Sequence, residues 1–422
     1  MFVPTTKPDS VTDAGVDIAK SAGVKLLRKE KDSIVLLVGS GSYHFRAAAT
    51  PIPMPVDAPL APKSGSPLDN LPKNIEVLTT FGERASISPD NKRVAFMNRS
   101  FGDAFEIDLA TRQIRCLTCE IPKAAFLRVM HLVTGDYLLI GPPHIFVDDL
   151  GRGRGEENQL WFMSQKPGSK PIKLGVKNFE GAAVSKTSLK LGWAQSGVQN
   201  KALAKDDYRL FTRELQIDPS GNSAKIINQK LVHQSMHPPC KLEAQDFFDS
   251  DKKMTFSCHK TTKEGEESAV VMIADLERGK VKEASYDPGV HNEPEGILTA
   301  TGNGTWTLIE SDRHSRDRGL RSGIDGWPVD IFKLLLNGTG QIWKRLTFFS
   351  EWKSWHASNP VASTDGKFMA FQAGGADDKG VFTGAGHGIL IYWFGAAKNA
   401  TTSSSSSVRG HSGGKPESRL AP

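Results

Sequence analysis

One pattern of hydrophobic and polar positions recurs through the middle of the chain. A short apolar segment is followed by a polar turn containing Asp, Asn or Gly, and then by a second segment that ends in aromatic or aliphatic residues. Turn residues of this kind between two strand-like segments predict a β-hairpin. Six copies occur, at residues 85–96, 127–140, 181–193, 246–256, 297–309 and 359–371.

Most copies are followed by a second pair of strand-like segments, as at 105–109 with 114–117. Four-stranded units repeated every ~40 to 60 residues are typical of a β-propeller. We therefore predict an all-β fold, a propeller of six or seven four-stranded blades. A β-sandwich is the alternative, but it predicts no fixed register between the turns and the hydrophobic residues beside them.

The two ends of the chain differ from this middle part. We predict an N-terminal extension over 1–72, partly disordered, with one strand near 34–38 and a Pro-rich linker from residue 50. The propeller should span 73–397. The Ser- and Gly-rich segment 398–422 cannot bury a core, so we expect a disordered tail.

Composition narrows the class of protein. The chain is 38% hydrophobic and 24% charged, with 40 Gly and 24 Pro, as in a soluble chain rich in turns. The net charge of +6 is spread along the sequence, which gives nucleic-acid binding little support. No run approaches the ~20 apolar residues of a membrane span, so we expect no membrane partner.

The four cysteines predict no metal framework. Cys116 and Cys119 form a lone C-x-x-C after a strand-like run, whereas a zinc site would need a second pair at similar spacing. A local disulfide or two buried thiols fit this pair better. We therefore expect no metal and no cofactor.

Several short segments carry a resemblance to known families. The hairpin copies resemble the PD40 repeats of TolB-type propellers. A narrower set, together with Cys116-Leu-Thr-Cys119, resembles fungal saponin hydrolases over residues 76–394. Its motifs are Asn292-Glu-Pro-Glu-Gly296, Thr307-Leu-Ile-Glu-Ser-Asp312, Asp330-Ile-Phe-Lys-Leu334, Arg345-Leu-Thr347, Ala357-Ser-Asn-Pro360, Phe368-Met-Ala-Phe-Gln372 and Gly386-His-Gly-Ile389.

This resemblance implies a hydrolase that cleaves a glucuronide linkage in a small glycoside or oligosaccharide, acting as an extracellular monomer. Two alternatives stay open, a uronate-specific polysaccharide lyase and a non-catalytic binding propeller. Four N-x-[ST] sequons would suit a secreted glycoprotein, but residues 1–20 lack the basic and apolar regions of a signal peptide. The turn after residue 297 and the irregular segment 198–206 also depart from the family pattern.

Carboxylates gather around one predicted hairpin. In an antiparallel hairpin the first strand begins on the face where the second strand ends. Residues just before the hairpin at 297–309 should therefore lie beside residues just after it. These candidate catalytic residues are Glu293, Glu295, Glu310, Asp312 and His314. Glycoside hydrolysis needs a proton donor and a second carboxylate, for which Glu295 and Glu310 are the leading pair.

The same reasoning places further polar groups on this face as candidate substrate contacts. An arginine fork binds a uronate carboxylate well, and Arg313 or Arg84 would supply it. A histidine would serve as the base if the reaction were β-elimination. The full set of predicted substrate-binding residues is Arg313, Arg84, His291, Asp246, His356 and Asn359.

Overall fold

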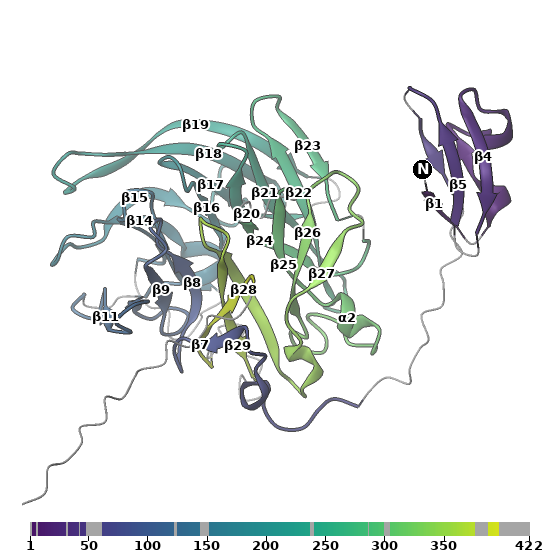
Figure 1. The fold of residues 1–422 in the computed structure, drawn as a ribbon. Coiled ribbons are helices and arrows are strands. Elements are labelled where there is room, and N and C mark those ends of the chain that lie inside the picture. Colours follow the sequence, from purple (N-terminus) through teal and green to yellow (C-terminus); the bar gives the residue numbers. More distant parts are fainter. Residues whose placement is uncertain are drawn as a thin grey trace, which may run out of the picture. The chain divides into compact units, whose positions relative to one another are not determined.

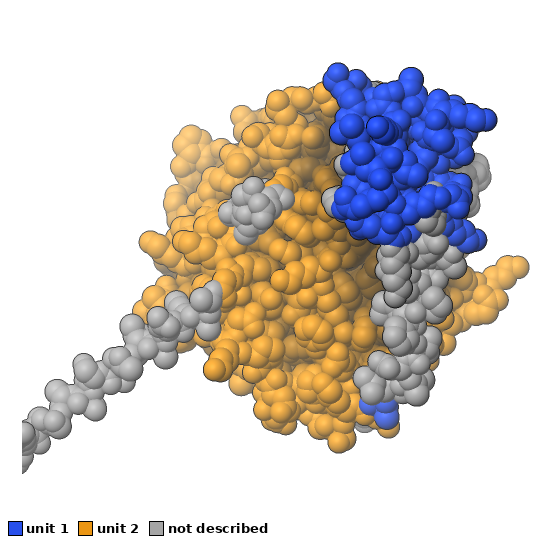
Figure 2. Space-filling model, turned by 45° about the vertical axis from the view of Figure 1, so that its right-hand side comes forward, with its two compact units in different colours: residues 1–61 blue, residues 62–422 orange. Residues whose placement is uncertain are grey.

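The structure is a computed structural model of the 422-residue chain. It describes residues 2–5, 7–30, 33–41, 43–47, 61–121, 125–143, 152–236, 240–285, 287–298, 304–375 and 387–395. The predicted tail over 398–422 lies outside these residues. The chain forms two compact units, Met1–Ala61 and Pro62–Pro422, coloured separately in Figure 2.

The first unit contains two three-stranded sheets. One is β1 (Phe2–Pro4), β5 (Ser33–Val38) and β4 (Val24–Lys29), and the other is β3 (Val16–Asp17), β2 (Thr12–Asp13) and β6 (Phe45–Arg46). Val3, Val11, Ile18, Ile34 and Leu36 form its small core. This part of the chain is therefore more ordered than the single strand predicted there, because five apolar side chains spread over 3–36 pack together.

The second unit contains six four-stranded antiparallel sheets in its described residues, numbered here as blades 1 to 6. Blades 1 to 3 are β8 (Glu83–Ile87), β9 (Arg93–Met97), β10 (Ala104–Asp108) and β11 (Ile114–Cys116); β12 (Arg128–His131), β13 (Tyr137–Gly141), β14 (Gln159–Met163) and β15 (Ile172–Lys177); and β16 (Ala182–Val184), β17 (Lys190–Gln195), β18 (Tyr208–Ile217) and β19 (Ala224–Ser235).

Blades 4 to 6 complete the circle seen in Figure 1. They are β20 (Lys241–Phe248), β21 (Lys253–Thr261), β22 (Glu267–Asp275) and β23 (Lys280–Glu283); β24 (Asn292–Leu298), β25 (Trp306–Ser311), β26 (Asp330–Leu335) and β27 (Trp343–Arg345); and β28 (His356–Ala362), β29 (Phe368–Gly374), β30 (Ile389–Trp393) and β7 (Ile75–Val77). The short helices are η1 (Pro8–Ser10), η2 (Ile18–Lys20), η3 (Pro67–Asn70), η4 (Gly153–Glu157), α2 (Arg313–Arg316) and η5 (Phe349–Glu351).

The chain is a β-propeller, as predicted, with six four-stranded blades among the described residues. Each of the six predicted hairpins is the first pair of strands in one blade. The strand β7, which precedes blade 1 in the sequence, does not form a blade of its own. It pairs with β30 and supplies the outermost strand of blade 6, where Tyr392 lies opposite Ile75.

Hydrophobic packing between neighbouring blades closes the ring. Each of six apolar clusters joins one pair of adjacent blades. The cluster between the last and first blades contains Phe368 and Ile391 from blade 6 with Val94 and Phe96 from blade 1. Residues 62–72 also belong to this unit, because Leu68 and Leu71 pack against blades 5 and 6. The boundary therefore lies at Pro62, earlier than predicted.

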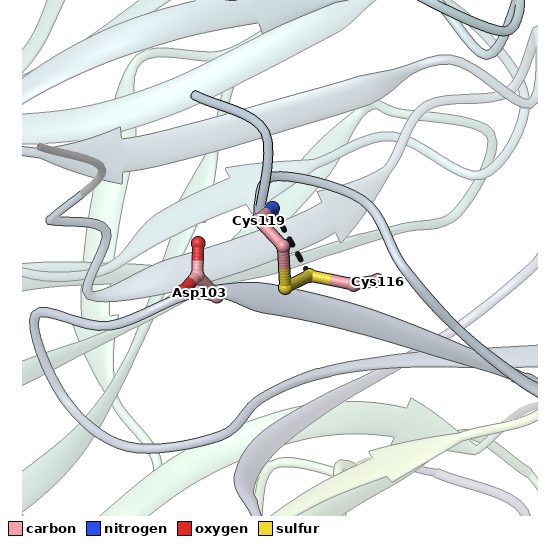
Figure 3. Close-up of side chains that lie close together, drawn as sticks. All are labelled: Asp103, Cys116 and Cys119. Carbon is pink, nitrogen blue, oxygen red and sulfur yellow. Dashed lines mark hydrogen bonds between the residues drawn. A yellow bond between two sulfur atoms is a disulfide. The ribbon is translucent and has the colours of Figure 1, made fainter. Parts of the chain in front are cut away.

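Two disulfides brace the propeller. Cys116 and Cys119 are joined at the end of β11, with Asp103 beside them in Figure 3. Cys240 and Cys258 link β20 to β21, a pairing that the sequence did not indicate. Because the sulfurs of Cys116 and Cys119 are bonded to each other, they are not the thiolates that a metal site would need.

Candidate functional site

A cavity lies between the innermost strands of the propeller. Its volume is about 100 Å³, and residues from the innermost strands of all six blades line it. A buried water needs ~10 to 15 Å³, so the cavity has room for several. One lining residue from each blade in turn is Arg84, Arg128, Ala182, Gln245, Glu295 and Val361.

Irregularities in the innermost strands bring polar side chains to the propeller axis. The strand pairing shifts register next to Arg84, Gln245, Glu295 and Asn359. A β-bulge adds a residue to one strand and re-aims its side chain, often beside an active site. Arg84 and Asn359 also adopt the left-handed backbone conformation, with φ of 52° and 49°.

The left-handed residues are held by side chains of the preceding blade. The backbone N–H of Asn359 donates to Glu310 Oε2 at 2.9 Å, and that of Arg84 donates to Gln372 Oε1 at 2.8 Å. Glu310 and Gln372 both lie near the end of the second strand of their blade. The same linkage therefore joins blade 5 to blade 6 and blade 6 to blade 1.

Buried carboxylates and histidines converge in blades 4 and 5. We call Glu243, His259, His291, Glu293, Glu295 and Glu310 the acid–histidine cluster. Glu293 and Glu310 face each other across the hairpin β24–β25, as the antiparallel pairing predicted. His259 Nε2 lies 3.4 Å from Glu293 Oε1 and 3.7 Å from Glu243 Oε2.

An arginine network borders this cluster. Arg84 contacts Glu83 at 2.7 Å and Glu180 at 3.5 Å, and Arg154 also bonds to Glu180. Arg128 NH2 lies 3.5 Å from Glu243 Oε1. Burial alone would lower the pKa of Arg128, but the charges of Glu295, Glu243 and Glu180 raise it, so this guanidinium stays charged.

The crowding of acids separates their pKa values. Burial, together with the charge of Glu293, raises the pKa of Glu310 to about 8 and raises that of Glu295 well above the usual range. Burial and the charges of Glu180 and Glu293 raise the pKa of Glu243 to about 8. Burial alone would also raise the pKa of Glu293, but His259 holds it well below the usual range.

The neighbouring carboxylates favour the protonated form of His259. Burial alone would lower its pKa, but Glu293 and Glu243 raise it to about 9. The cluster therefore combines proton-donating and ionised groups within one buried site, as acid–base chemistry requires.

Three predicted residues lie outside the cluster because the chain leaves the sheet after Ser311. Asp312 is fully buried and accepts hydrogen bonds from the backbone N–H groups of His291 and Ser322 at 3.0 and 3.2 Å. Arg313 pairs with Asp287 and stacks on Trp343, 4.1 Å from the ring centroid. Asp312 therefore touches the cluster through the backbone of His291, and Arg313 pairs with a carboxylate outside it.

His314 and His356 also lie elsewhere. His314 is on α2, where burial and the charges of Arg345 and Arg318 lower its pKa. His356 begins β28 opposite Gly374, and burial lowers its pKa to about 4. Neither contacts a carboxylate of the cluster within the described residues.

Asp246 has a structural position between blades. Its Oδ2 accepts from the backbone N–H of Ile297 at 2.8 Å and from Lys186 at 2.9 Å, and its Oδ1 accepts from its neighbour Phe247 at 2.8 Å. The bond to Ile297 joins blade 4 to blade 5, the contact with Lys186 joins it to blade 3, and the bond to Phe247 stays within β20. Asp246 therefore lines the cavity with both carboxylate oxygens already bonded to the protein.

Arg128, Arg154 and Glu180 were not predicted. A signal existed for Arg128, since it begins the innermost strand of blade 2 at the level where Glu83 begins that of blade 1. Arg154 comes from η4, between the second and third strands of blade 2. No hairpin pattern indicates that this insertion reaches Glu180.

Several solved structures are similar to this chain at low sequence identity. No protein-family model matches the sequence, and a search of curated proteins finds no match. Similar solved structures include a putative TolB from Agrobacterium tumefaciens (12% identity, 64% of this chain and 77% of that chain, TM-score 0.42). Others are TolB from Acinetobacter baumannii (13%, 74% and 62%, 0.39) and a calcium-binding regucalcin from A. tumefaciens (11%, 75% and 92%, 0.43). No helix in the described residues has the length and apolar character to span a membrane. These likenesses concern the propeller fold alone.

Proposed function

We propose that the chain is an enzyme that hydrolyses a glucuronide linkage at the end of the axial cavity, as the resemblance to saponin hydrolases implies. One observation carries the proposal: four buried glutamates and Arg128 meet where the innermost strands of blades 2, 4 and 5 begin. A buried cluster of this kind costs folding free energy, and such costs are typically retained at reaction sites.

Position in the cluster suggests a division of roles. Glu295 lines the cavity, so it is the group that would transfer a proton to the leaving oxygen of the substrate. Glu293 faces Glu310 across the hairpin and is kept ionised by His259, so it would supply the second function, activation of the attacking water. Water then adds to the anomeric carbon and gives a proton to Glu293, while the aglycone leaves with the proton from Glu295.

Arg128 replaces Arg313 as the proposed uronate contact. Arg128 lines the cavity, and its Nε has no hydrogen-bond partner among the described residues. A guanidinium binds a carboxylate with two parallel hydrogen bonds. The two disulfides are typical of proteins from an oxidising compartment, which fits the proposed extracellular location.

A lyase is the second candidate, favoured by the histidines. His291 lies 3.4 Å from Glu293 and could abstract the proton beside a uronate carboxylate. Hydrolysis breaks the bond between the anomeric carbon and the glycosidic oxygen, whereas elimination breaks the bond between C4 of the uronate and its oxygen substituent. Only elimination leaves a double bond in the sugar.

The test is incubation of the purified chain with a glucuronide-bearing triterpenoid saponin and with uronate oligosaccharides. Free aglycone and ultraviolet absorbance of an unsaturated uronate are followed together. Hydrolysis yields aglycone without that absorbance. We expect Glu295→Gln to lower kcat by ~100-fold or more, the usual contribution of a proton-transfer group.

Glu264→Gln is the matched control, because Glu264 is exposed on the loop after β21. It should cleave at the wild-type rate. Absence of cleavage of every glucuronide, or full activity of Glu295→Gln, would reject the proposal. An unsaturated product would establish the lyase instead.

A further inference from the structure

The side chain of His291 is buried in the propeller and makes no hydrogen bond among the described residues. His291 is 0% exposed, and neither ring nitrogen has a hydrogen-bond partner among the described residues. Its backbone N–H is fixed by Asp312 at 3.0 Å, and Trp327 packs edge-on against its ring at 4.5 Å. A buried polar group without a partner is costly, so its position needs an explanation.

Two carboxylates lie close to the Nε2 atom of this ring. His291 Nε2 lies 3.4 Å from Glu293 Oε2 and 4.0 Å from Glu310 Oε1. All three candidate ligand atoms lie within 4.8 Å of one another. Ligand atoms bound at about 2.0 to 2.2 Å to one ion lie ~3.4 Å apart in tetrahedral geometry, so the side chains would need to approach one another by no more than ~1.5 Å.

Outer contacts orient both carboxylates. The second oxygen of Glu310 accepts from the backbone N–H of Asn359 at 2.9 Å. The second oxygen of Glu293 accepts from Gln245 Nε2 at 3.0 Å. In each case the oxygen left over is the one nearest His291. Supporting hydrogen bonds of this kind are usual around metal ligands.

Carboxylates are plentiful around these residues. Six buried glutamates lie in this part of the propeller: Glu83, Glu180, Glu243, Glu293, Glu295 and Glu310. A divalent ion held by two of them would stabilise the ionised carboxylates.

We propose that His291, Glu293 and Glu310 bind one divalent transition-metal ion. Imidazole with carboxylate is a ligand set suited to Zn²⁺ or Mn²⁺, whereas Ca²⁺ and Mg²⁺ prefer oxygen ligands alone. These three residues therefore have the donor atoms and the orientation to hold an ion.

The ion would serve the proposed function, on which this part of the inference rests. A bound divalent ion lowers the pKa of a coordinated water, so Glu293 and Glu310 would activate the attacking water through the ion. It would also attract the carboxylate of a glucuronate. Glu295, on the cavity side, stays free to transfer the proton.

Metal binding is tested apart from activity. The full-length chain is stripped with a chelator, dialysed and titrated with Zn²⁺ and with Mn²⁺ by calorimetry, and bound metal is counted by mass spectrometry. We expect about one ion per chain in the wild type. His291→Gln and Glu310→Gln should each weaken binding by ~100-fold or more.

His233→Gln is the matched control, because His233 lies in the outermost strand β19 of blade 3. It should bind like the wild type. Circular dichroism checks the fold of each variant, and the near-isosteric Glu310→Gln decides the matter if His291→Gln does not fold. Failure of both ions to bind at micromolar concentration, or wild-type affinity in Glu310→Gln, would overturn the site.

The two proposals fail separately. Glucuronide cleavage that persists in metal-free protein would refute a role of the ion in catalysis and support the hydrolase. Stoichiometric metal binding without any glucuronide cleavage would support the metal site and refute the hydrolase.

Discussion

Replacement of Glu106 by Gln should cost the propeller a measurable part of its stability. Glu106 lies on β10 and is 3% exposed. Side chains from blades 1 and 2 contact its carboxylate. Its Oε1 lies 2.8 Å from Tyr137 Oη and 3.0 Å from His131 Nε2, both in blade 2. Its Oε2 lies 2.6 Å from Arg115 of blade 1.

The size of the effect follows from the pKa of this carboxyl group. Burial alone would raise it, but the bonds from His131 and Tyr137 lower it from 4.5 to about 2. A pKa difference of ~2.5 between the unfolded and folded states, at 1.36 kcal/mol for each pKa unit, corresponds to about 3 kcal/mol. Partial access of water reduces this, so we expect Glu106→Gln to lower the free energy of unfolding by about 2 to 3 kcal/mol at pH 7.

The contribution depends on pH with a definite sign. Because the folded state binds the proton more weakly than the unfolded state, the stabilisation is complete above pH ~4.5 and is lost as the pH falls toward ~2. The difference between the wild type and Glu106→Gln should therefore narrow by about 1 kcal/mol between pH 7 and pH 3.5.

Urea denaturation at both pH values measures this difference. Glu264→Gln, an exposed replacement of the same kind, should match the wild type at both. A Glu106→Gln difference that stayed constant with pH, or that was absent at pH 7, would show that the bonds between blades 1 and 2 do not favour the ionised carboxylate.

Two further replacements separate structural residues from the proposed site. Asp246→Ala removes the acceptor of the Ile297 and Phe247 N–H groups, so we expect a loss of about 2 kcal/mol or more in urea denaturation; an unchanged midpoint would refute the structural role. Arg313→Ala breaks a partly exposed ion pair with Asp287 and the stacking on Trp343, so the free energy of unfolding should fall by about 1 kcal/mol or less. The KM for a glucuronide should not change. A raised KM would show that Arg313 contacts the substrate.

The fold could be predicted because its signals are local. Each first hairpin places Asp, Asn or Gly between two apolar segments, as at Pro89-Asp90-Asn91 between β8 and β9. The closure of blade 6 by β7 could not, because Ile75 and Tyr392 lie more than 300 residues apart and no local pattern relates them. The disulfide between Cys240 and Cys258 likewise depends on the pairing of β20 with β21.

The site was predictable as far as the strands continue. Glu293 and Glu310 face each other because antiparallel pairing fixes which residues are opposite. That rule stops where the strand stops. Ser311 is the last residue of β25, and the chain then turns into α2, so Asp312, Arg313 and His314 follow the helix away from the sheet.

Two prolines in the innermost strands indicate where the strand pairing is irregular. Proline removes a backbone donor, so inside a sheet it is confined to edges and bulges. Pro294 precedes Glu295 in β24 and Pro360 follows Asn359 in β28, and at both points the register shifts. The innermost strand of a blade has no partner on its axial side, so it tolerates proline there. A proline in the first strand of a propeller hairpin therefore marks the level at which a neighbouring side chain can turn to the axis. In this chain Glu295, beside Pro294, belongs to the acid–histidine cluster, and Asn359, beside Pro360, is bonded to its member Glu310.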